Sequence, residues 1–322
     1  MQIDIGTIYL NNNPVDYVAD DGLIRALEIA IALGKPLLIS GEPGTGKTKL
    51  ADFAAMQLAG QTGGQPNAFL DKPFVFNTKS TSVSTDLFYF YDAVSHFRSQ
   101  HAETSTEQFI ELKPMGLAIA QTHGLNNPDL DKIRKLNNLS PEWIKPDPRS
   151  SVVLIDEIDK APREFPNDLL NEIENYRFDI KEMNASVTRC PGECRILVIM
   201  TSNSEKNLPN AFLRRCVFYH ISFPNNEKLL AIAKKRLTIN NGTYDDLILK
   251  AIDEFNSIRS RAVNKKPSTS EFLDWINLLQ YYKLLNNESF KPGNTDPVFA
   301  AAKGTLVKNF EDQVILNTNA AT

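Results

Sequence analysis

The sequence is poor in several features that would each point to a particular class of protein. Three cysteines among 322 residues are too few for a disulfide framework. No apolar run reaches about 18 residues, so no membrane-spanning helix is expected. The N-terminus has no basic segment followed by an apolar one, so we expect no secretory signal and a cytoplasmic protein. The net charge of -4 disfavours a dedicated duplex-DNA binder.

Two of the three cysteines, Cys190 and Cys194, stand in a C-x3-C arrangement. A zinc site would need further ligands, and the histidines show no metal-binding spacing. Reduced thiols are therefore the better interpretation of this pair.

Short apolar segments alternate with helical patterns through the first two thirds of the chain. The five expected strands lie in PLLIS, KPFVFNT, VVLI (152–155), CRILVIMTSN and CVFYHISF. Further short strands are expected within 3–18, around the turn at 11–14. A helix is expected between Asp20 as N-cap and Gly34 as C-cap. This alternation predicts a doubly wound α/β sheet, with ligands at the carboxyl ends of its strands.

The pattern changes after Pro224. Four stretches with helical periodicity follow, and no apolar strand is seen among them; they cover about 225–237, 244–260, 268–285 and 296–316. We therefore expect an α/β domain over 1–224 and a helical domain over 225–322. The acidic excess lies in the α/β part.

GEPGTGKT follows the first apolar segment and fits the pattern G-x-x-x-x-G-K-(S/T). In such loops consecutive backbone N–H groups wrap a phosphate, and the next helix adds the positive end of its dipole. Lys47 would reach the β- and γ-phosphates, and the Thr48 hydroxyl would ligate Mg²⁺. A glycine-rich turn with an exposed lysine is the alternative, but the strand before and the helix after favour ATP and Mg²⁺ as cofactors. The candidate binding residues are Gly41, Glu42, Pro43, Gly44, Thr45, Gly46, Lys47, Thr48 and Lys49.

VVLIDEID ends a buried strand in carboxylates. In a P-loop enzyme Asp156 would hold the magnesium shell. Glu157 can accept a proton from an attacking water, as a general base must. Both carboxylates could instead simply cap the next helix, but the phosphate loop upstream favours catalysis.

Two further groups follow. Asn203 ends the strand in ILVIMTSN. If this strand lies beside the strand that ends at Asp156, Asn203 would point towards the γ-phosphate. Taken alone, an asparagine after a strand is usually a turn residue. Arg214 and Arg215 end a short helix, where two arginines are commonly solvated partners of the helix dipole.

In this order, GEPGTGKT, VVLIDEIDKAPREFPNDLLNEIE and VIMTSNSEKNLPNAFLRRCVFYHISFP resemble an AAA+ ATPase, and more finely the MoxR family, over roughly 15–285. The resemblance implies a P-loop NTPase sheet with a smaller C-terminal helical lid. It also implies a homo-oligomeric, hexameric ring with ATP between subunits, and a chaperone-like remodelling role. The implied partner is a von Willebrand factor A domain protein or another protein client.

The resemblance also assigns roles to residues. It makes Lys47 and Thr48 the phosphate-loop pair, Asp156 the magnesium carboxylate, Glu157 the catalytic base and Asn203 the γ-phosphate sensor. One or both of Arg214 and Arg215 would be a finger inserted into a neighbour's site, where it stabilises charge on the transferring phosphate. Tyr17 and Val18 stand where the family packs the adenine.

Three other stretches bear on the resemblance. FIELKPMGLAIAQTHG resembles the family's insertion, a strand followed by a helix around 105–125, which could point into a ring's pore. Residues 177–195 predict a hairpin whose turn lies at Pro191-Gly192. At the start of the lid helix, Ser270 and Glu271 stand where a second sensor arginine is often found. Ser268 or Thr269 would cap this helix. Arg259 or Arg261, on the preceding segment, is the candidate to replace the sensor.

Two other functions stay open. A nucleotide-switched scaffold would bind ATP but barely hydrolyse it, and the missing second sensor arginine is compatible with that. A nucleic-acid motor or loader is disfavoured, because the α/β part is acidic and no basic patch is interleaved with aromatic residues.

Overall fold

The structure, a computed structural model, describes residues 13–99, 105–136, 138–204, 207–237, 244–291 and 294–318. These residues form two compact units. The sheet unit comprises Ala19–Gly41 and Lys47–Ile221, and the helical unit comprises the described parts of Met1–Val18, Glu42–Gly46 and Ser222–Thr322. Because each unit draws on separate segments of the chain, the division of the chain at 224–226 stays a prediction.

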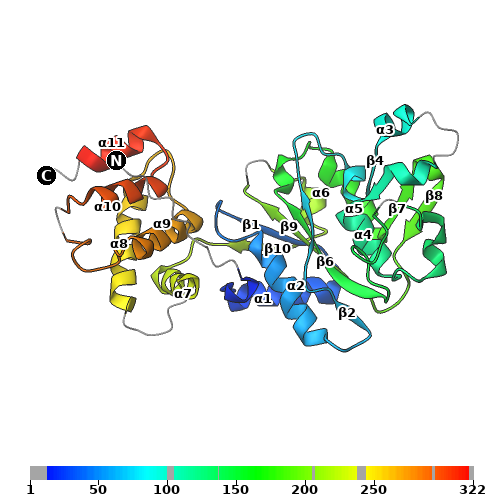
Figure 1. Cartoon of the computed structure of the whole chain (residues 1–322), viewed down its shortest axis with the longest axis horizontal. Helices are drawn as coiled ribbons and strands as arrows, with labels where there is room; N and C mark the ends of the chain where they lie inside the picture. The colour runs from blue at the N-terminus through cyan, green and yellow to red at the C-terminus, as the bar shows by residue number, and fades with distance from the viewer. Residues whose placement is uncertain are drawn as a thin grey trace. The chain divides into compact units, whose positions relative to one another are not determined.

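The sheet unit is built on a parallel sheet with strand order β10-β1-β9-β6, continued by β3 on β6 (Figure 1). Every pairing in it is parallel. The five expected strands are confirmed, and β2, which pairs with the start of β6, was not predicted. The strands are β1 Leu37–Gly41, β2 Asn67–Phe69, β3 Phe74–Asn77, β6 Arg149–Asp156, β9 Ile196–Ser202 and β10 Val217–Ile221.

The central strands are apolar because both of their faces are covered. β1 and β9 are buried along their whole length, whereas β3 and β10 alternate in exposure. Helix α1 packs on β10 and β1, α2 packs on β6, and α4 packs on β6 and β3. The helices of this unit are α1 Asp21–Leu33, α2 Lys49–Thr62, α3 Ala93–Arg98, α4 Pro114–Gln121, α5 Phe165–Asn175 and α6 Asn210–Leu213.

Helix α1 begins and ends where its caps predict. The Asp20 side chain accepts a hydrogen bond from the Leu23 N–H at 2.8 Å. Gly34 ends the helix in the left-handed conformation, with φ 61°. The chain before α1 differs from the expectation of short strands over 3–18. Pro14–Asp16 forms a 3-10 turn, because Asn13 accepts from the Val15 N–H and Pro14 suits a first helical position; residues 3–12 lie outside the described residues.

The expected insertion around 105–125 has its strand and its helix. β5 (Ile110–Leu112) pairs with β4 (Tyr89–Tyr91), and α4 follows at once. Helix α4 is buried and belongs to the core. It packs so closely that a Cβ added to Gly116 would lie only 2.1 Å from the Phe88 carbonyl oxygen. The helix is therefore a structural part of the sheet unit.

The expected hairpin over 177–195 is present, but its turn was predicted wrongly. β7 (Arg177–Ile180) pairs with β8 (Ala185–Thr188), and the chain reverses through the intervening residues, with Asn184 at φ 49°. Asparagine tolerates this left-handed conformation. Pro191-Gly192 instead lies on the way into β9, where the Cys194 thiol donates to Asn67 Oδ1 at 3.2 Å.

The helical unit has its own apolar core, around Phe255, Phe272 and Trp275. The first three expected helices are confirmed, but the last, over 296–316, is broken. It divides at Gly304, and the new helix begins where the Asn309 side chain accepts from the Glu311 N–H at 2.8 Å. The helices are α7 Asn226–Arg236, α8 Asp245–Arg261, α9 Thr269–Tyr281, α10 Pro297–Ala302 and α11 Phe310–Thr318.

Candidate functional site

The phosphate-loop motif connects the end of β1 to the start of α2. Gly44 and Gly46 have φ of 75° and 87°, a conformation in which other residues are strained. The Lys47 side chain is buried, and its Nζ donates to the Gly41 carbonyl oxygen at 2.8 Å. Lys47 therefore lies along its own loop, as a lysine that contacts phosphate held there would.

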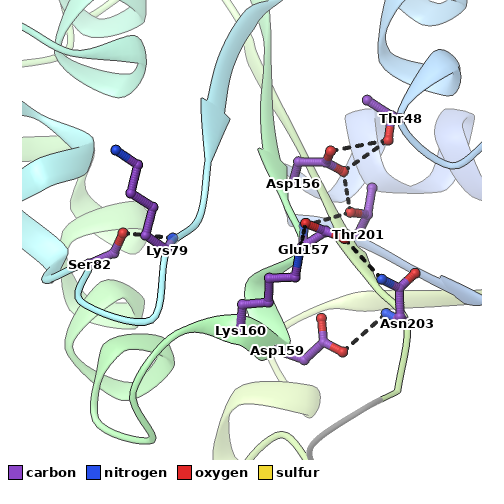
Figure 2. A network of polar contacts seen from close by, with 9 residues as sticks. All are labelled: Thr48, Lys79, Ser82, Asp156, Glu157, Asp159, Lys160, Thr201 and Asn203. Carbon is purple, nitrogen blue, oxygen red and sulfur yellow. Dashed lines mark hydrogen bonds and ion pairs between the residues drawn. The ribbon is translucent and has the colours of Figure 1, made fainter. Parts of the chain in front are cut away.

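Thr48, Asp156 and Thr201 form a cluster at the carboxyl ends of β6 and β9, beside the start of α2 (Figure 2). Thr48 Oγ1 lies 3.1 Å from both carboxylate oxygens of Asp156. Thr201 Oγ1 donates to Asp156 Oδ1 at 2.5 Å. Parallel pairing of β6 with β9 places Asp156 and Thr201 at the same edge of the sheet.

The side chains of this cluster have the chemistry of Mg²⁺ ligands. Hydroxyl and carboxylate oxygens are the ligands that Mg²⁺ prefers, usually with one or two carboxylates completed by phosphate and water. Thr48 and Asp156 supply one of each at mutual hydrogen-bond distance. The described residues hold no group of three or more His, Cys, Asp or Glu side chains suited to a metal. The cluster therefore fits a magnesium ion that takes most of its ligands from phosphate and water.

Glu157 follows Asp156 in a strained backbone conformation, with φ 55°. Its N–H donates to Thr201 Oγ1 at 2.8 Å. Both side-chain oxygens are engaged: Oε1 accepts from Asn203 Nδ2 at 3.1 Å, and Oε2 forms an ion pair with the Lys160 ammonium (Figure 2). The candidate base is thus held between the ends of two neighbouring strands.

Asn203 lies where the sequence predicts, directly after β9. Its N–H donates to Asp159 Oδ2 at 3.1 Å, and its side-chain amide faces Glu157. Asp159 is only 2% exposed. Asn203 is therefore fixed from its backbone while its amide reaches the candidate base, and the γ-phosphate contact expected of it stays a prediction.

Thr201, Asp159 and Lys160 are residues of this network to which sequence reasoning gave no role. Thr201 donates to Asp156 and accepts from Glu157, so one hydroxyl links the candidate metal ligand to the candidate base. The signal for Thr201 was a threonine at the end of a buried strand. The signal for Lys160 was its place three residues after Glu157, which a 3-10 turn brings within reach.

The two arginines after α6 differ in their surroundings. Arg215 Nε donates to Glu174 Oε1 at 2.6 Å, so its guanidinium is held by α5. Arg214 is exposed, and no described residue bonds its side chain. Neither arginine bonds Thr48, Asp156 or Glu157 in the described part of the chain.

The helical unit includes the loop segment Glu42–Gly46, and Tyr17 packs against it. A Cβ on Gly46 would lie 3.2 Å from Tyr17 Cε2. Tyr17 is therefore next to the phosphate loop; its expected contact with adenine, and that of Val18, stay predictions. Ser268 is the N-cap of α9 and forms a reciprocal capping box with Glu271. Of the two caps that the sequence allowed, Ser268 and Thr269, the first is therefore the one used.

Comparison with known proteins places this chain in a family. The family model described as "ATPase family associated with various cellular activities (AAA)" matches residues 37–225, more than half of the chain. The chain belongs to the AAA family. Its parallel sheet with flanking helices is the AAA+ P-loop NTPase fold, and AAA proteins in general bind and hydrolyse ATP and form rings.

Two solved structures resemble this AAA protein only distantly. A proposed ATPase from Cytophaga hutchinsonii is 15% identical, with 94% of this chain and 91% of that chain covered and a TM-score of 0.40. A RuvB variant from Thermotoga maritima is 16% identical, with 91% and 69% covered and a TM-score of 0.43. Scores below 0.5 carry no functional argument. No curated protein matches the chain. In its described part no helix combines the length and apolarity that crossing a membrane requires.

Proposed function

We propose that this AAA protein is an Mg²⁺-dependent ATP hydrolase of the MoxR type, which remodels a protein partner as a ring of identical subunits. The observation that carries the proposal is the placement of Glu157. Its carboxylate lies between Asn203 and Lys160, and its backbone is bonded to the same threonine that bonds Asp156. A protein that only stored nucleotide would need no carboxylate there.

The phosphate loop would bind the phosphates of ATP, and the cluster of Thr48, Asp156 and Thr201 would bind Mg²⁺. Lys47 would exchange its bond with the Gly41 carbonyl for the β- and γ-phosphates. Thr48 and Asp156 would hold Mg²⁺, which when bound neutralises charge on the phosphates. Thr201 keeps Asp156 oriented, because its hydroxyl donates to that carboxylate.

Glu157 would act as the general base. It accepts a proton from a water molecule as the water oxygen attacks the γ-phosphorus and ADP leaves. For this, one of its oxygens must exchange its present partner for the water. Asn203, fixed through Asp159, would then orient the water or the γ-phosphate.

Arg214 is the better candidate for the finger that completes a neighbour's site. Arg215 is committed to Glu174 of its own subunit, whereas Arg214 is exposed and unpaired among the described residues. A guanidinium inserted from outside would stabilise the charge that develops on the transferred phosphate. This assignment supports an active ring, hexameric by resemblance to the MoxR family.

The resemblance of the three motif stretches to the MoxR family supports a cytoplasmic, chaperone-like role. A von Willebrand factor A domain protein or another protein client is the proposed partner. The acidic balance of the chain disfavours a nucleic-acid substrate.

A nucleotide-switched scaffold is the second candidate, and one observation favours it. Both oxygens of Glu157 are engaged, one of them by a lysine ammonium. If this arrangement persisted with ATP bound, the base could not act and the protein would bind without turnover.

The experiment compares Glu157→Gln with Lys47→Ala. Glu157→Gln keeps the shape but removes the base, so ATP should bind normally while turnover falls by roughly 10²–10⁴-fold. Lys47→Ala should weaken binding itself. Nucleotide affinity by calorimetry and steady-state phosphate release measure the two effects. If the wild type binds ATP but its turnover equals that of Glu157→Gln, the scaffold is the correct function.

A further inference from the structure

Arg259, near the end of α8, is bonded to the phosphate loop itself. Its Nη2 donates to Glu42 Oε2 at 2.5 Å, and both residues belong to the helical unit. Its Nη1 donates to the Pro267 carbonyl oxygen at 2.5 Å. The guanidinium carbon lies 3.7 Å from the centre of the Phe223 ring. The Arg259 side chain is only 13% exposed, so three contacts hold it in one place.

The start of α9 lies directly against the same loop. A Cβ added to Gly44 would stand 2.6 Å from Ser270 Oγ and 2.7 Å from Ser268 Oγ. A long side chain at position 270 would therefore collide with the loop in this arrangement. This crowding gives a steric reason why Ser270 stands where related proteins often carry an arginine.

Glu42 is an anionic residue in a loop built to hold anionic phosphates. Its carboxylate is 51% exposed and forms an ion pair with Arg259. An unpaired carboxylate there would repel bound phosphate, and the repulsion would be felt by any nucleotide that occupies the loop. The Arg259 guanidinium compensates the negative charge of Glu42 and fixes the first turn of the loop.

We propose that Arg259 is a positioning residue for nucleotide binding, which acts through Glu42 and does not sense the γ-phosphate. Both of its terminal nitrogens are engaged, one by Glu42 and one by a backbone carbonyl. A γ-phosphate sensor acts on ATP and leaves ADP binding unchanged. A residue that neutralises Glu42 affects both nucleotides equally. The inference rests on the proposed binding of ATP by this loop.

The test is a double-mutant cycle between Arg259→Met and Glu42→Gln in the full chain, read by calorimetry with Mg²⁺ and either ADP or a non-hydrolysable ATP analogue. Arg259→Met keeps an apolar side chain on Phe223. We expect it to weaken both nucleotides by the same factor, roughly 5–20-fold. Glu42→Gln completes the cycle, and in the Arg259→Met background it should restore most of the affinity that Arg259→Met loses.

Arg261→Ala is the matched control. Arg261 lies on the same helix, but among the described residues its side chain bonds only the Ser257 carbonyl oxygen of that helix, so its loss should leave both affinities unchanged. Arg259→Lys keeps the charge but not the two-pronged geometry, and it should lose an intermediate amount for both nucleotides. It replaces Arg259→Met if that variant does not fold by circular dichroism.

The outcomes separate the inference from the proposed function. A wild type that binds neither nucleotide overturns the proposed function, and the inference falls with it. A wild type that binds, together with a loss confined to the ATP analogue, makes Arg259 a sensor and overturns the inference alone. Failure of Glu42→Gln to restore affinity also overturns it, because Arg259 would then not act through Glu42.

Discussion

Glu157 combines a strained backbone with a fully occupied side chain. Its φ of 55° is uncommon for a residue other than glycine and costs of order 1 kcal/mol. The bonds from its N–H to Thr201 and from Asn203 to its side chain hold this conformation. The strain places the carboxylate beyond the strand end, where a water molecule at the γ-phosphate could reach it.

Lys160 restrains this carboxylate, so we predict that Lys160→Met raises ATP turnover by about 3–10-fold. Without the ammonium, Glu157 Oε2 can accept the proton of the water without first giving up an ion pair. Steady-state phosphate release, with KM unchanged, measures the effect. Lys79→Met is the control, because the Lys79 side chain points away from Glu157 (Figure 2). A fall in turnover in Lys160→Met would show that the lysine assists catalysis.

At the scale of elements, Asp312 joins α11 to the chain that follows α8. Its carboxylate accepts from the N–H groups of Val263, Asn264 and Lys265, at 3.0, 3.2 and 3.1 Å. Burial alone would raise the pKa of Asp312, but the hydrogen bonds from Asn264, Val263 and Lys265 lower its pKa overall. The ionised form is therefore favoured by folding.

The sign of the pH dependence follows from the lowered pKa. The contribution of Asp312 is present above its unfolded pKa of about 3.9 and is lost as the pH falls through the folded pKa. We predict that Asp312→Asn lowers the melting temperature by several degrees at pH 7, and that the gap from wild type narrows below about pH 4. Thermal melts by circular dichroism between pH 3 and 7 measure it.

The neighbouring Glu311→Gln is the control for this prediction. In the part of the chain that the structure describes, the Glu311 carboxylate accepts only from the Asn264 side chain, at 3.0 Å, and it is exposed. Its substitution should change the melting temperature little at any pH. A gap for Asp312→Asn that stays constant from pH 7 to pH 3 would mean that shape, and not charge, explains the loss.

Elements were predictable where the signal is local. Asp20 and Gly34 bound α1 because each cap acts within one turn of its own helix. The turn between β7 and β8 was missed because pairing across the hairpin, and not the conspicuous Pro191-Gly192, decides where the chain reverses. The motif residues of the site were likewise local patterns. Thr201 and Arg259 act through partners 45 and 217 positions away, which no spacing reveals.

At the scale of the whole molecule, the exposed Arg214 predicts a site completed only by a second subunit. Arg214→Ala and Glu157→Gln should each be nearly inactive alone. When the two are mixed equally, a random ring has both parts intact at about a quarter of its interfaces. Steady-state turnover should therefore recover to about a quarter of wild type, and wild-type activity should rise steeply with protein concentration.

Arg215→Ala is the comparison for this experiment. Arg215 is bonded to Glu174 within its own subunit, so its loss should lower stability more than turnover. A mixture that stays as inactive as its components, while light scattering and exchange of labelled subunits show that mixed rings form, would mean that Arg214 does not act across an interface.

The neighbours of β1 in the sheet constrain how the protein is made. β1 ends at Gly41, but the strands beside it, β9 and β10, begin at Ile196 and Val217. A ribosome must therefore synthesise most of the sheet unit before this strand has a partner on either side. Until then the phosphate loop has no rigid strand to start from, and the apolar segment before it stays exposed to other chains. A nascent chain truncated before β9 should thus be a client of general chaperones and not yet a binder of nucleotide.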